Sequence, residues 1–217
     1  MCGRRKNALQ ETAAAFPEGS DYRICAVDLL DGGRTAEMLK NIIMETGPAA
    51  GLVHCAGVRT SVPLKMISEE QLLTDYHINV VSGFILARLL SGKKFTCPTG
   101  ASFVFLASAA GHRGAAGILS YTANKGALLS GVRALASELA VKKIRVNTVS
   151  PGFVLNTGIT NAEFDAMPTE AKIKIENAHL LGLGHVSDVA KPIIFLLGDD
   201  ARWITGADLK VDGGFCI

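Results

Sequence analysis

Short apolar runs alternate with longer amphipathic segments along this chain. The apolar runs are rich in β-branched residues and predict strands at residues 23–27, 51–56, 102–107, 144–149 and 207–211. The longer segments predict helices at residues 5–16, 35–44, 68–90, 121–141 and 186–198. Alternating strands and helices imply right-handed crossovers and a parallel sheet covered on both faces. The pattern therefore predicts a doubly wound, Rossmann-like α/β fold.

Composition narrows the class of protein. The chain has 217 residues, of which 48% are hydrophobic, so its length and apolar content predict one folded domain over residues 1–217. Its net charge of +2 provides no broad basic field, so we expect no nucleic-acid partner. No apolar run is long enough to cross a bilayer, so we expect no membrane partner.

The cysteines indicate a reducing compartment. There are 5 of them, an odd number without CxxC spacing, which suits neither a disulfide framework nor a zinc site. We interpret them as small buried hydrophobes, and we expect a cytoplasmic protein because no apolar signal segment follows the first charged residues. His179 and His185 lack partners at metal-ligand spacing, so we expect no metal.

Small or turn-forming residues follow three of the predicted strands. Gly57 follows the second strand, Ser108 follows the third, and Pro151 and Gly152 follow the fourth. Open α/β sheets bind ligands at the carboxyl ends of their strands. The alternative is that these residues only mark turns, but their recurrence at three strands favours a ligand site.

Tyr121 and Lys125 are candidates for chemistry. They are four residues apart near the start of a predicted helix and share a face of it. A lysine ammonium beside a phenol favours the phenolate, so we expect the pKa of Tyr121 to be lowered and the tyrosine to exchange a proton with a substrate oxygen. The alternative is a surface tyrosine beside a solvated lysine. Ser108 favours the catalytic hypothesis, because the small residues after it can return its hydroxyl to the helix.

The ordered set of motifs resembles the short-chain dehydrogenase/reductase family and is similar to its 3-oxoacyl-acyl-carrier-protein reductases. The resemblance covers essentially the whole chain. The matching segments, in order, are Cys55-Ala56-Gly57, His77-Ile78-Asn79-Val80, Ser108 with Tyr121 and Lys125, Arg145 to Gly152, Ser187-Asp188-Val189-Ala190, Phe195-Leu196-Leu197, Ile204-Thr205-Gly206 and Val211-Asp212-Gly213-Gly214.

This resemblance implies an NADP-dependent oxidoreductase that interconverts a ketone and a secondary alcohol by hydride transfer. Tyr121 would be the general acid and base, Lys125 would tune it and hold the nicotinamide ribose, and Ser108 would polarise the carbonyl. Asn79 would hold a water in a proton relay to Lys125, although a polar residue inside a helix can also bond its own backbone. Further cofactor contacts would come from Ala56, Gly57, Pro151, Gly152, Val154 and Thr157.

The largest departure from the family is at the start of the chain. The family begins with a central strand and a glycine-rich loop that binds the pyrophosphate, and neither precedes Met1. We therefore expect Met1 to lie inside the family's second strand, with upstream residues omitted from the sequence. The alternative is a truncated, non-catalytic member that acts as a structural or regulatory subunit. An in-frame glycine-rich strand–turn–helix upstream of Met1 would favour the enzyme.

Arg4 and Arg5 bear on the choice of cofactor. In the family, a basic residue after the second strand pairs with the 2′-phosphate of NADP, and arginine binds phosphate through its fork of donors. Residues 1–6 contain no acid, so we expect NADP rather than NAD, and the alternative is a solvated basic turn. Asp28 resembles the family's adenine-contacting aspartate, or it caps the next turn.

Smaller departures affect the adenine side and the nicotinamide side. His54 and Cys55 replace two asparagines of the family. The segment that follows Pro151 and Gly152 is one residue longer than in the family, so either Asn156 or Thr157 takes the place of the family's threonine.

The family's variable lid corresponds to about residues 156–184. Its apolar residues and its lack of clustered basic residues favour a modest apolar substrate over a phosphorylated one. His112 and Arg113, which lie close to Ser108 in sequence, either line the pocket or are exposed loop residues.

Self-association is also expected. Ala123, Ala127, Ser130 and Ala134 form a stripe of small residues on one helix, which permits close packing in the core or against a partner. In the family, the helices that correspond to residues 68–90 and 121–141 build the subunit interface. The resemblance therefore implies a homotetramer or a homodimer.

Overall fold

Parallel strands form the centre of the protein, in a computed structural model that describes the backbone of residues 1–217 and all side chains except those of 161–163. One sheet contains β3 (Gly51–His54), β4 (Ala101–Leu106), β5 (Ile144–Pro151) and β6 (Asp208–Val211) in that order. A separate parallel ladder joins β1 (Cys2–Gly3) to β2 (Cys25–Ala26), and the Met1 carbonyl accepts a hydrogen bond from the Cys25 amide at 2.8 Å. All strand pairs are parallel, as the sequence pattern predicts.

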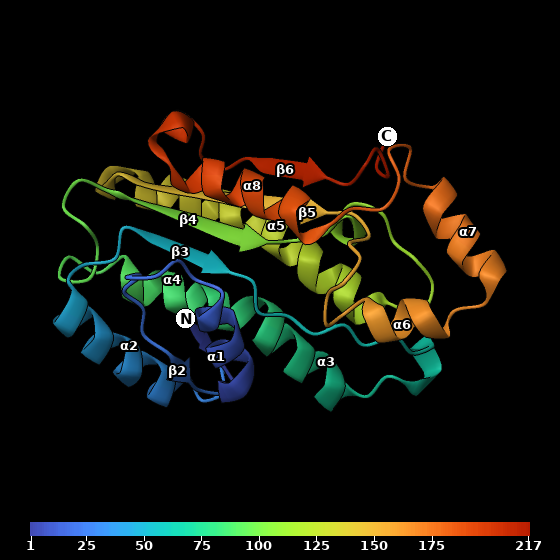
Figure 1. The fold of residues 1–217 in the computed structure, drawn as a ribbon, viewed down its shortest axis with the longest axis horizontal. Helices are drawn as coiled ribbons and strands as arrows, with labels where there is room; N and C mark the ends of the chain where they lie inside the picture. Colours follow the sequence, from blue (N-terminus) through green and yellow to red (C-terminus); the bar gives the residue numbers. More distant parts are fainter.

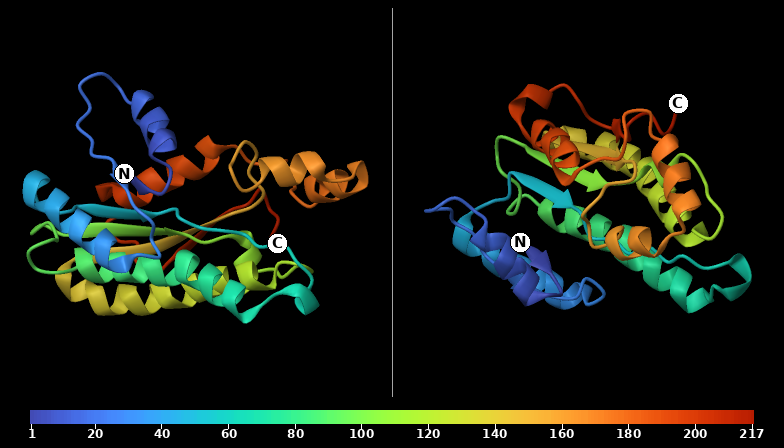
Figure 2. Two further views of the ribbon diagram at one scale, coloured as in Figure 1. Left: turned by 90° about the horizontal axis from the view of Figure 1, so that it is seen from below. Right: turned by 45° about the vertical axis from the view of Figure 1, so that its right-hand side comes forward.

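Helices cover both faces of the four-stranded sheet (Figures 1 and 2). Helices α4 (Ser82–Leu90) and α5 (Leu119–Leu139) lie on one face and α8 (Val186–Leu197) lies on the other. On β4, Phe103 and Phe105 pack into the core beneath α4 and α5, whereas Val104 packs into the core beneath α8. Successive side chains of a strand point to opposite faces, so both faces of the sheet are buried, as a parallel sheet requires.

Each predicted strand and helix is present within a few residues of its expected bounds. Three further helices precede α4 in the chain: α1 (Lys6–Ala14), α2 (Gly32–Thr46) and α3 (Glu69–Tyr76). Short 3₁₀ turns are found at η1 (Leu64–Met66), η4 (Ala140–Lys142) and η5 (Asp199–Ala201). Within the part of the chain that the structure describes, no helix has the length and apolar character needed to cross a bilayer.

The helix predicted at residues 68–90 is not continuous. Ser68 caps α3 by accepting from the Gln71 amide at 3.1 Å, but the Gln71 side chain donates to Asp75 Oδ1 instead of returning to the cap. A π-helical turn, η2 (His77–Val81), then separates α3 from α4. Such turns are rare and are frequent at functional sites, and this one carries Asn79.

Two helices that the sequence pattern does not predict form part of the expected lid. They are α6 (Asn161–Ala166) and α7 (Thr169–Asn177), and they lie beyond the carboxyl ends of the strands (Figure 1). The Leu155 amide donates to Gly184 O at 2.9 Å and the Gly184 amide donates to Phe153 O at 3.0 Å. These bonds join the two ends of residues 155–184, so the lid is one long loop that starts and ends beside β5.

Candidate active site

Ser108 lies at the carboxyl edge of the sheet, in a turn that packs directly against α5. It follows β4 and begins the short helical turn η3 (Ala109–Gly111), where its Oγ accepts from the Ala110 amide at 3.1 Å. A Cβ on Gly111 would lie 2.9 Å from the carbonyl carbon of Lys125, closer than side chains approach backbone. Glycine at this position therefore lets the serine turn approach the first turns of α5.

Tyr121 projects from that part of α5 toward the serine turn. Tyr121 and Ser108 line the same cavity, where the Ser108 side chain acts on the tyrosine hydroxyl as a hydrogen-bond partner. Burial raises the pKa of Tyr121, while the Ser108 hydrogen bond and the nearby Arg59 charge oppose the increase. The expected lowering of this pKa by Lys125 is therefore wrong for this structure, in which the Lys125 Nζ lies 5.5 Å from the centre of the tyrosine ring.

Lys125 is the buried cation of the site. Only 4% of its surface is exposed, and its Nζ donates to the Leu106 carbonyl at 2.6 Å. Burial lowers its pKa to about 8, although the nearby Cys55 opposes the change. The alternative of a solvated surface lysine does not apply.

Asn79 is fully buried on the π-helical turn and holds the chain that follows β3. Its Nδ2 donates to Val58 O and its Oδ1 accepts from the Val58 amide, both at 3.0 Å. Its side chain therefore bonds the backbone of another segment and not the backbone of its own helix. A Cβ on Gly57 would lie 2.8 Å from Asn79 Oδ1 and 3.5 Å from Lys125 Nζ. Asn79 and Lys125 thus converge on a cradle that a larger residue at position 57 would fill.

That cradle fits the ribose end of a nicotinamide nucleotide. The Lys125 ammonium has three donors, of which one bonds the Leu106 carbonyl, and the others suit the vicinal hydroxyls of a ribose. The neighbouring Ala56 and Gly57 are half-buried. The chain after β5 borders the same edge: Pro151 ends the strand and Gly152 follows it. The predicted residues at the ends of β3, β4 and β5 are therefore gathered at one edge of the sheet.

The extra residue after Gly152 is absorbed by a left-handed turn. Asn156 adopts a φ of 60°, a conformation that asparagine tolerates better than most residues. Thr157 bonds Thr160 through their hydroxyls at 2.7 Å, and Thr160 Oγ1 bonds the Val154 carbonyl. Asn156 thus accommodates the longer segment, while Thr157 keeps its hydroxyl in the loop that carries Val154.

Arg4, Arg5 and Asp28 are grouped on the other ladder. The register pairs Gly3 with Ala26, so the exposed Arg4 and Arg5 leave the same edge as Asp28. Asp28 Oδ1 accepts from the Leu30 amide at 3.0 Å, so it does cap the following turn.

His54, one of the two departures before Ala56, is buried with 3% of its surface exposed. Its Nε2 lies 3.1 Å from Ser82 Oγ, and the Ser82 hydroxyl already donates to Ile78 O, so His54 donates to Ser82. Burial lowers the pKa of His54 to about 4, helped by the positive charge of Lys125. The histidine is neutral at physiological pH.

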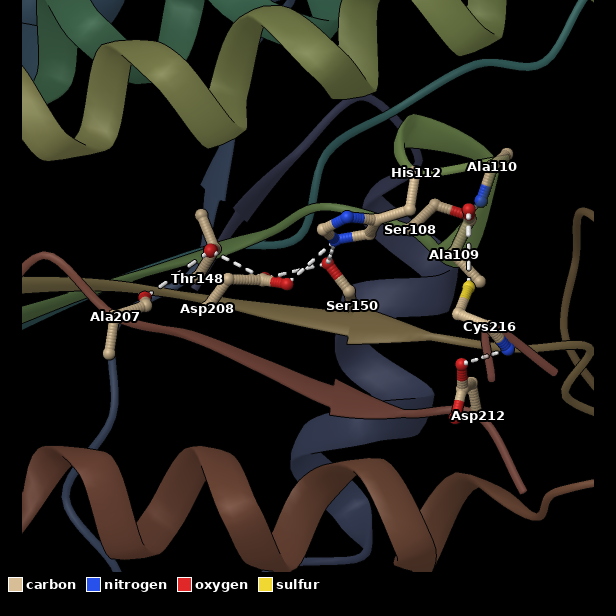
Figure 3. Close-up of polar contacts among 10 residues, drawn as sticks. All are labelled: Ser108, Ala109, Ala110, His112, Thr148, Ser150, Ala207, Asp208, Asp212 and Cys216. Carbon is tan, nitrogen blue, oxygen red and sulfur yellow. Dashed lines mark hydrogen bonds and ion pairs between the residues drawn. The ribbon is translucent and has the colours of Figure 1, made fainter. Parts of the chain in front are cut away.

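The serine turn is also held by a polar cluster that sequence reasoning missed (Figure 3). Asp208 Oδ2 accepts from His112 Nε2 at 2.8 Å, and Asp208 Oδ1 accepts from the Thr148 and Ser150 hydroxyls at 2.6 and 2.7 Å. His112 therefore points to β6 instead of lining the pocket. The contact joins residues 96 apart in the chain, so no local sequence signal could have revealed it.

The cluster is not a hydrolytic triad. In such a triad the aspartate and the serine contact different ring nitrogens of the histidine. Here both Asp208 and Ser150 approach His112 Nε2, and Ser150 is fully buried. The cluster instead ties the turn after Ser108 to β5 and β6.

A cavity of about 260 Å³ opens beside Ser108 and Tyr121. Its wall is mostly apolar and includes residues of the serine turn, the loop after β5, the lid and the carboxyl-terminal tail, among them Ala109, Ile118, Phe153, Ile159, Ile175 and Phe215. Arg113 lines this cavity, which is one of the two alternatives given for it from the sequence. Arg59 lines the cavity as well. His179 and Phe215 were not anticipated; their rings stack at 4.7 Å.

Comparison with known families agrees with this geometry. The family model described as enoyl-(acyl carrier protein) reductase matches residues 2–216. A short-chain dehydrogenase/reductase of Aspergillus versicolor is 33% identical over 78% of this chain and 59% of its own length. The human 3-oxoacyl-[acyl-carrier-protein] reductase is 33% identical over 93% of this chain and 81% of its own length.

Solved structures give the same result. A blue fluorescent protein from a metagenomic library, determined with NADPH, is 31% identical with a TM-score of 0.85, covering 98% of this chain and 82% of its own. A 7α-hydroxysteroid dehydrogenase complexed with NADH is 25% identical with a TM-score of 0.89, covering 98% and 82%. The chain therefore belongs to the short-chain dehydrogenase/reductase family of NAD(P)-dependent oxidoreductases.

Proposed function

We propose that this protein interconverts a ketone and a secondary alcohol with NADP(H) as the cofactor. The observation that carries the proposal is the placement of Tyr121 and Ser108 on the wall of one mostly apolar cavity, with the buried Lys125 beside the tyrosine ring. When bound at this edge, the cofactor supplies or accepts the hydride.

The side chains have distinct roles in this proposal. Ser108 and Tyr121 hydrogen-bond the substrate oxygen, and Tyr121 gives it a proton in reduction and removes that proton in oxidation. Lys125 holds the ribose and places a positive charge near Tyr121. Asn79 keeps the Val58 backbone in position next to Lys125 and takes part in a water relay. Ala56, Gly57, Pro151, Gly152, Val154 and Thr157 border the cofactor.

The test of the reaction is Tyr121→Phe, which removes the proposed proton donor and keeps the ring. General acid–base catalysis contributes about 10²- to 10⁴-fold, so we expect NADPH-dependent ketone reduction to fall by that order while cofactor affinity, measured by fluorescence, stays nearly unchanged. A variant that retained a tenth of the wild-type turnover would remove Tyr121 from the mechanism.

The preference for NADP rests on Arg4 and Arg5, which follow β1 at the edge where Asp28 follows β2. Residues 1–6 contain no acidic residue that would repel a phosphate. A hydrogen bond to a charged group is worth roughly 1.5–3 kcal/mol, and an exposed site lies at the lower end. Replacing both arginines with alanine should raise the Kd for NADPH about tenfold and leave that for NADH nearly unchanged. Equal affinity of the unmutated protein for both cofactors at low salt would contradict the assignment.

The proposal includes a cytoplasmic homo-oligomer. Only Cys25 of the five cysteines is buried, so their interpretation as buried hydrophobes is wrong for the other four. All five are scattered and unpaired, which suits a reducing compartment. Ala123, Ser130 and Ala134 are exposed on α5, where small residues allow a second copy to approach closely.

A further inference from the structure

The substrate cavity is positively charged as well as apolar. Of its described lining residues, two are arginines, Arg59 and Arg113, and none is an aspartate or glutamate. Arg113 is exposed and Arg59 is half-buried, so both guanidinium groups keep contact with solvent while they line the cavity. Two positive charges without an acidic side chain among the described lining residues favour an anionic ligand.

His179, the other basic side chain on the wall, has a structural task. Its Nε2 accepts from the Phe153 amide at 3.0 Å, and its Nδ1 donates to the Ile175 carbonyl at 2.7 Å. A ring that accepts at one nitrogen and donates at the other is neutral. Within the described lining, the two arginines thus supply the positive charge.

Arg113 is held in place at the rim of the cavity. It follows the serine turn, its Nη1 donates to the Phe215 carbonyl at 3.2 Å, and its Cζ lies 4.8 Å from the centre of the Phe215 ring. Guanidinium has five donors in a rigid plane, so this single hydrogen bond leaves others for a ligand. Arg113 lines the same cavity as Ser108 and Tyr121, the residues proposed to bind the carbonyl oxygen.

Arg59 places a second positive charge beside Tyr121. Its Cζ lies 5.9 Å from the centre of the Tyr121 ring, and its charge favours the phenolate. A negative group on the substrate would therefore be attracted by the positive charge of Arg59 and could accept hydrogen bonds from Arg113.

We propose that the substrate is a small oxo acid, a ketone whose carboxylate lies a few bonds from the carbonyl. This inference rests on the proposed function. Ser108 and Tyr121 take the ketone oxygen, and Arg113 takes the carboxylate through the two parallel hydrogen bonds that suit this pair. Reduction adds a hydride to the carbonyl carbon and the Tyr121 proton to its oxygen, which gives a hydroxy acid with the carboxylate unchanged. The cavity of about 260 Å³ is near the lower end for ligand sites, which favours a short chain.

A matched pair of probes tests the charge without requiring the natural substrate. Acetoacetate and methyl acetoacetate carry the same ketone, but only the acid is anionic. We expect calorimetry to show binding of the acid about 10- to 100-fold tighter than the ester in the unmutated protein, the range for a charge-assisted pair. Arg113→Gln should abolish this preference, Arg113→Lys should restore part of it, and Arg202→Gln, an exposed arginine outside the lining, should leave it intact.

The outcomes separate this inference from the proposed function. Equal binding of the acid and the ester, or a preference that survives Arg113→Gln, would overturn the oxo-acid assignment. Turnover is measured separately as NADPH oxidation. Reduction of the ester that depends on Tyr121 would uphold the ketone reductase even if the acid were not preferred. A preference for the acid in binding, without turnover of either probe, would uphold the anion site and count against the reductase.

Discussion

At the scale of single residues, burial outweighs charge in setting the ionisation of the site. It raises the pKa of Tyr121 and lowers that of Lys125 to about 8, so each group is moved toward its neutral form. A tyrosine with a raised pKa keeps its proton at neutral pH. Tyr121 is therefore in the protonated form that ketone reduction needs, whereas removal of a proton from an alcohol needs the phenolate.

His54 offers a residue-scale prediction about stability. Its folded-state pKa of about 4 lies below the ordinary value of 6.5, so the unfolded chain binds a proton more readily than the folded one. The stability contribution of neutral His54 is present above pH 6.5 and is lost as the pH falls toward 4. Since one pH unit corresponds to about 1.4 kcal/mol, the loss approaches about 3 kcal/mol at acid pH.

Denaturant unfolding at several pH values checks this prediction. His54→Gln keeps a donor that can reach Ser82 and cannot titrate, so its unfolding free energy should depend less on pH between 6.5 and 4. NMR of the His54 ring provides a direct control, because the ring should not titrate until the pH is close to 4. An identical pH dependence in the variant and the unmutated protein would contradict the prediction.

At the scale of elements, the sequence predicts the strands and helices that have a regular local pattern of apolar and polar residues. The alternation of apolar runs and amphipathic segments predicts all the strands from β2 to β6, because each lies in a short segment with apolar residues that is separated from the helices by turns. The pattern does not predict the π-helical turn at Asn79, because this turn leaves the order of polar and apolar positions in residues 68–90 nearly unchanged. The pattern does not predict helix α7, because this helix has no buried residue and therefore no apolar face.

The candidate site shows the same limit. The spacing of Tyr121 and Lys125 predicts a shared helix face, and the strand ends predict a shared edge. The cluster of His112, Asp208 and Ser150 could not be predicted, because it depends on how β6 pairs with β5 and on where the serine turn packs.

This cluster leads to a prediction for the serine turn as an element. Loss of the His112–Asp208 bond should free the turn and misplace Ser108, and small displacements of catalytic groups are costly. We expect His112→Leu to lower kcat for ketone reduction about tenfold, with little change in the Kd for NADPH. His112→Gln, which can still donate to Asp208, should retain most of the activity.

Comparison of kcat with thermal stability distinguishes positioning from general support. If His112→Leu lowered Tm but left kcat unchanged below Tm, the bond would contribute only to stability. A loss of activity in His112→Gln equal to that in His112→Leu would also contradict the prediction, because the donor alone would then not matter.

At the scale of the whole molecule, the outer face of α5 differs from the rest of the surface. Ala123, Ser130 and Ala134 are exposed there, whereas Ala127 is half-buried and packs against the core. The buried side chains of the same helix, such as Leu128 and Val132, face the sheet. Of the two readings of the stripe, packing in the core holds for Ala127 alone, and packing against a second copy stays a prediction for Ala123, Ser130 and Ala134.

Introducing charge into the stripe tests this assembly. Ser130→Glu combined with Ala134→Glu places two like charges where two α5 helices would meet, and the repulsion and lost close packing should convert the oligomer into monomers in light scattering after size-exclusion chromatography. Because both positions are exposed in the single chain, Tm of the monomer should change little. Met44→Glu, at a position 82% exposed on α2, is the matched control and should leave the mass unchanged. An unmutated protein that is monomeric at micromolar concentration, or a double variant that keeps the full oligomeric mass, would rule out α5 as the interface.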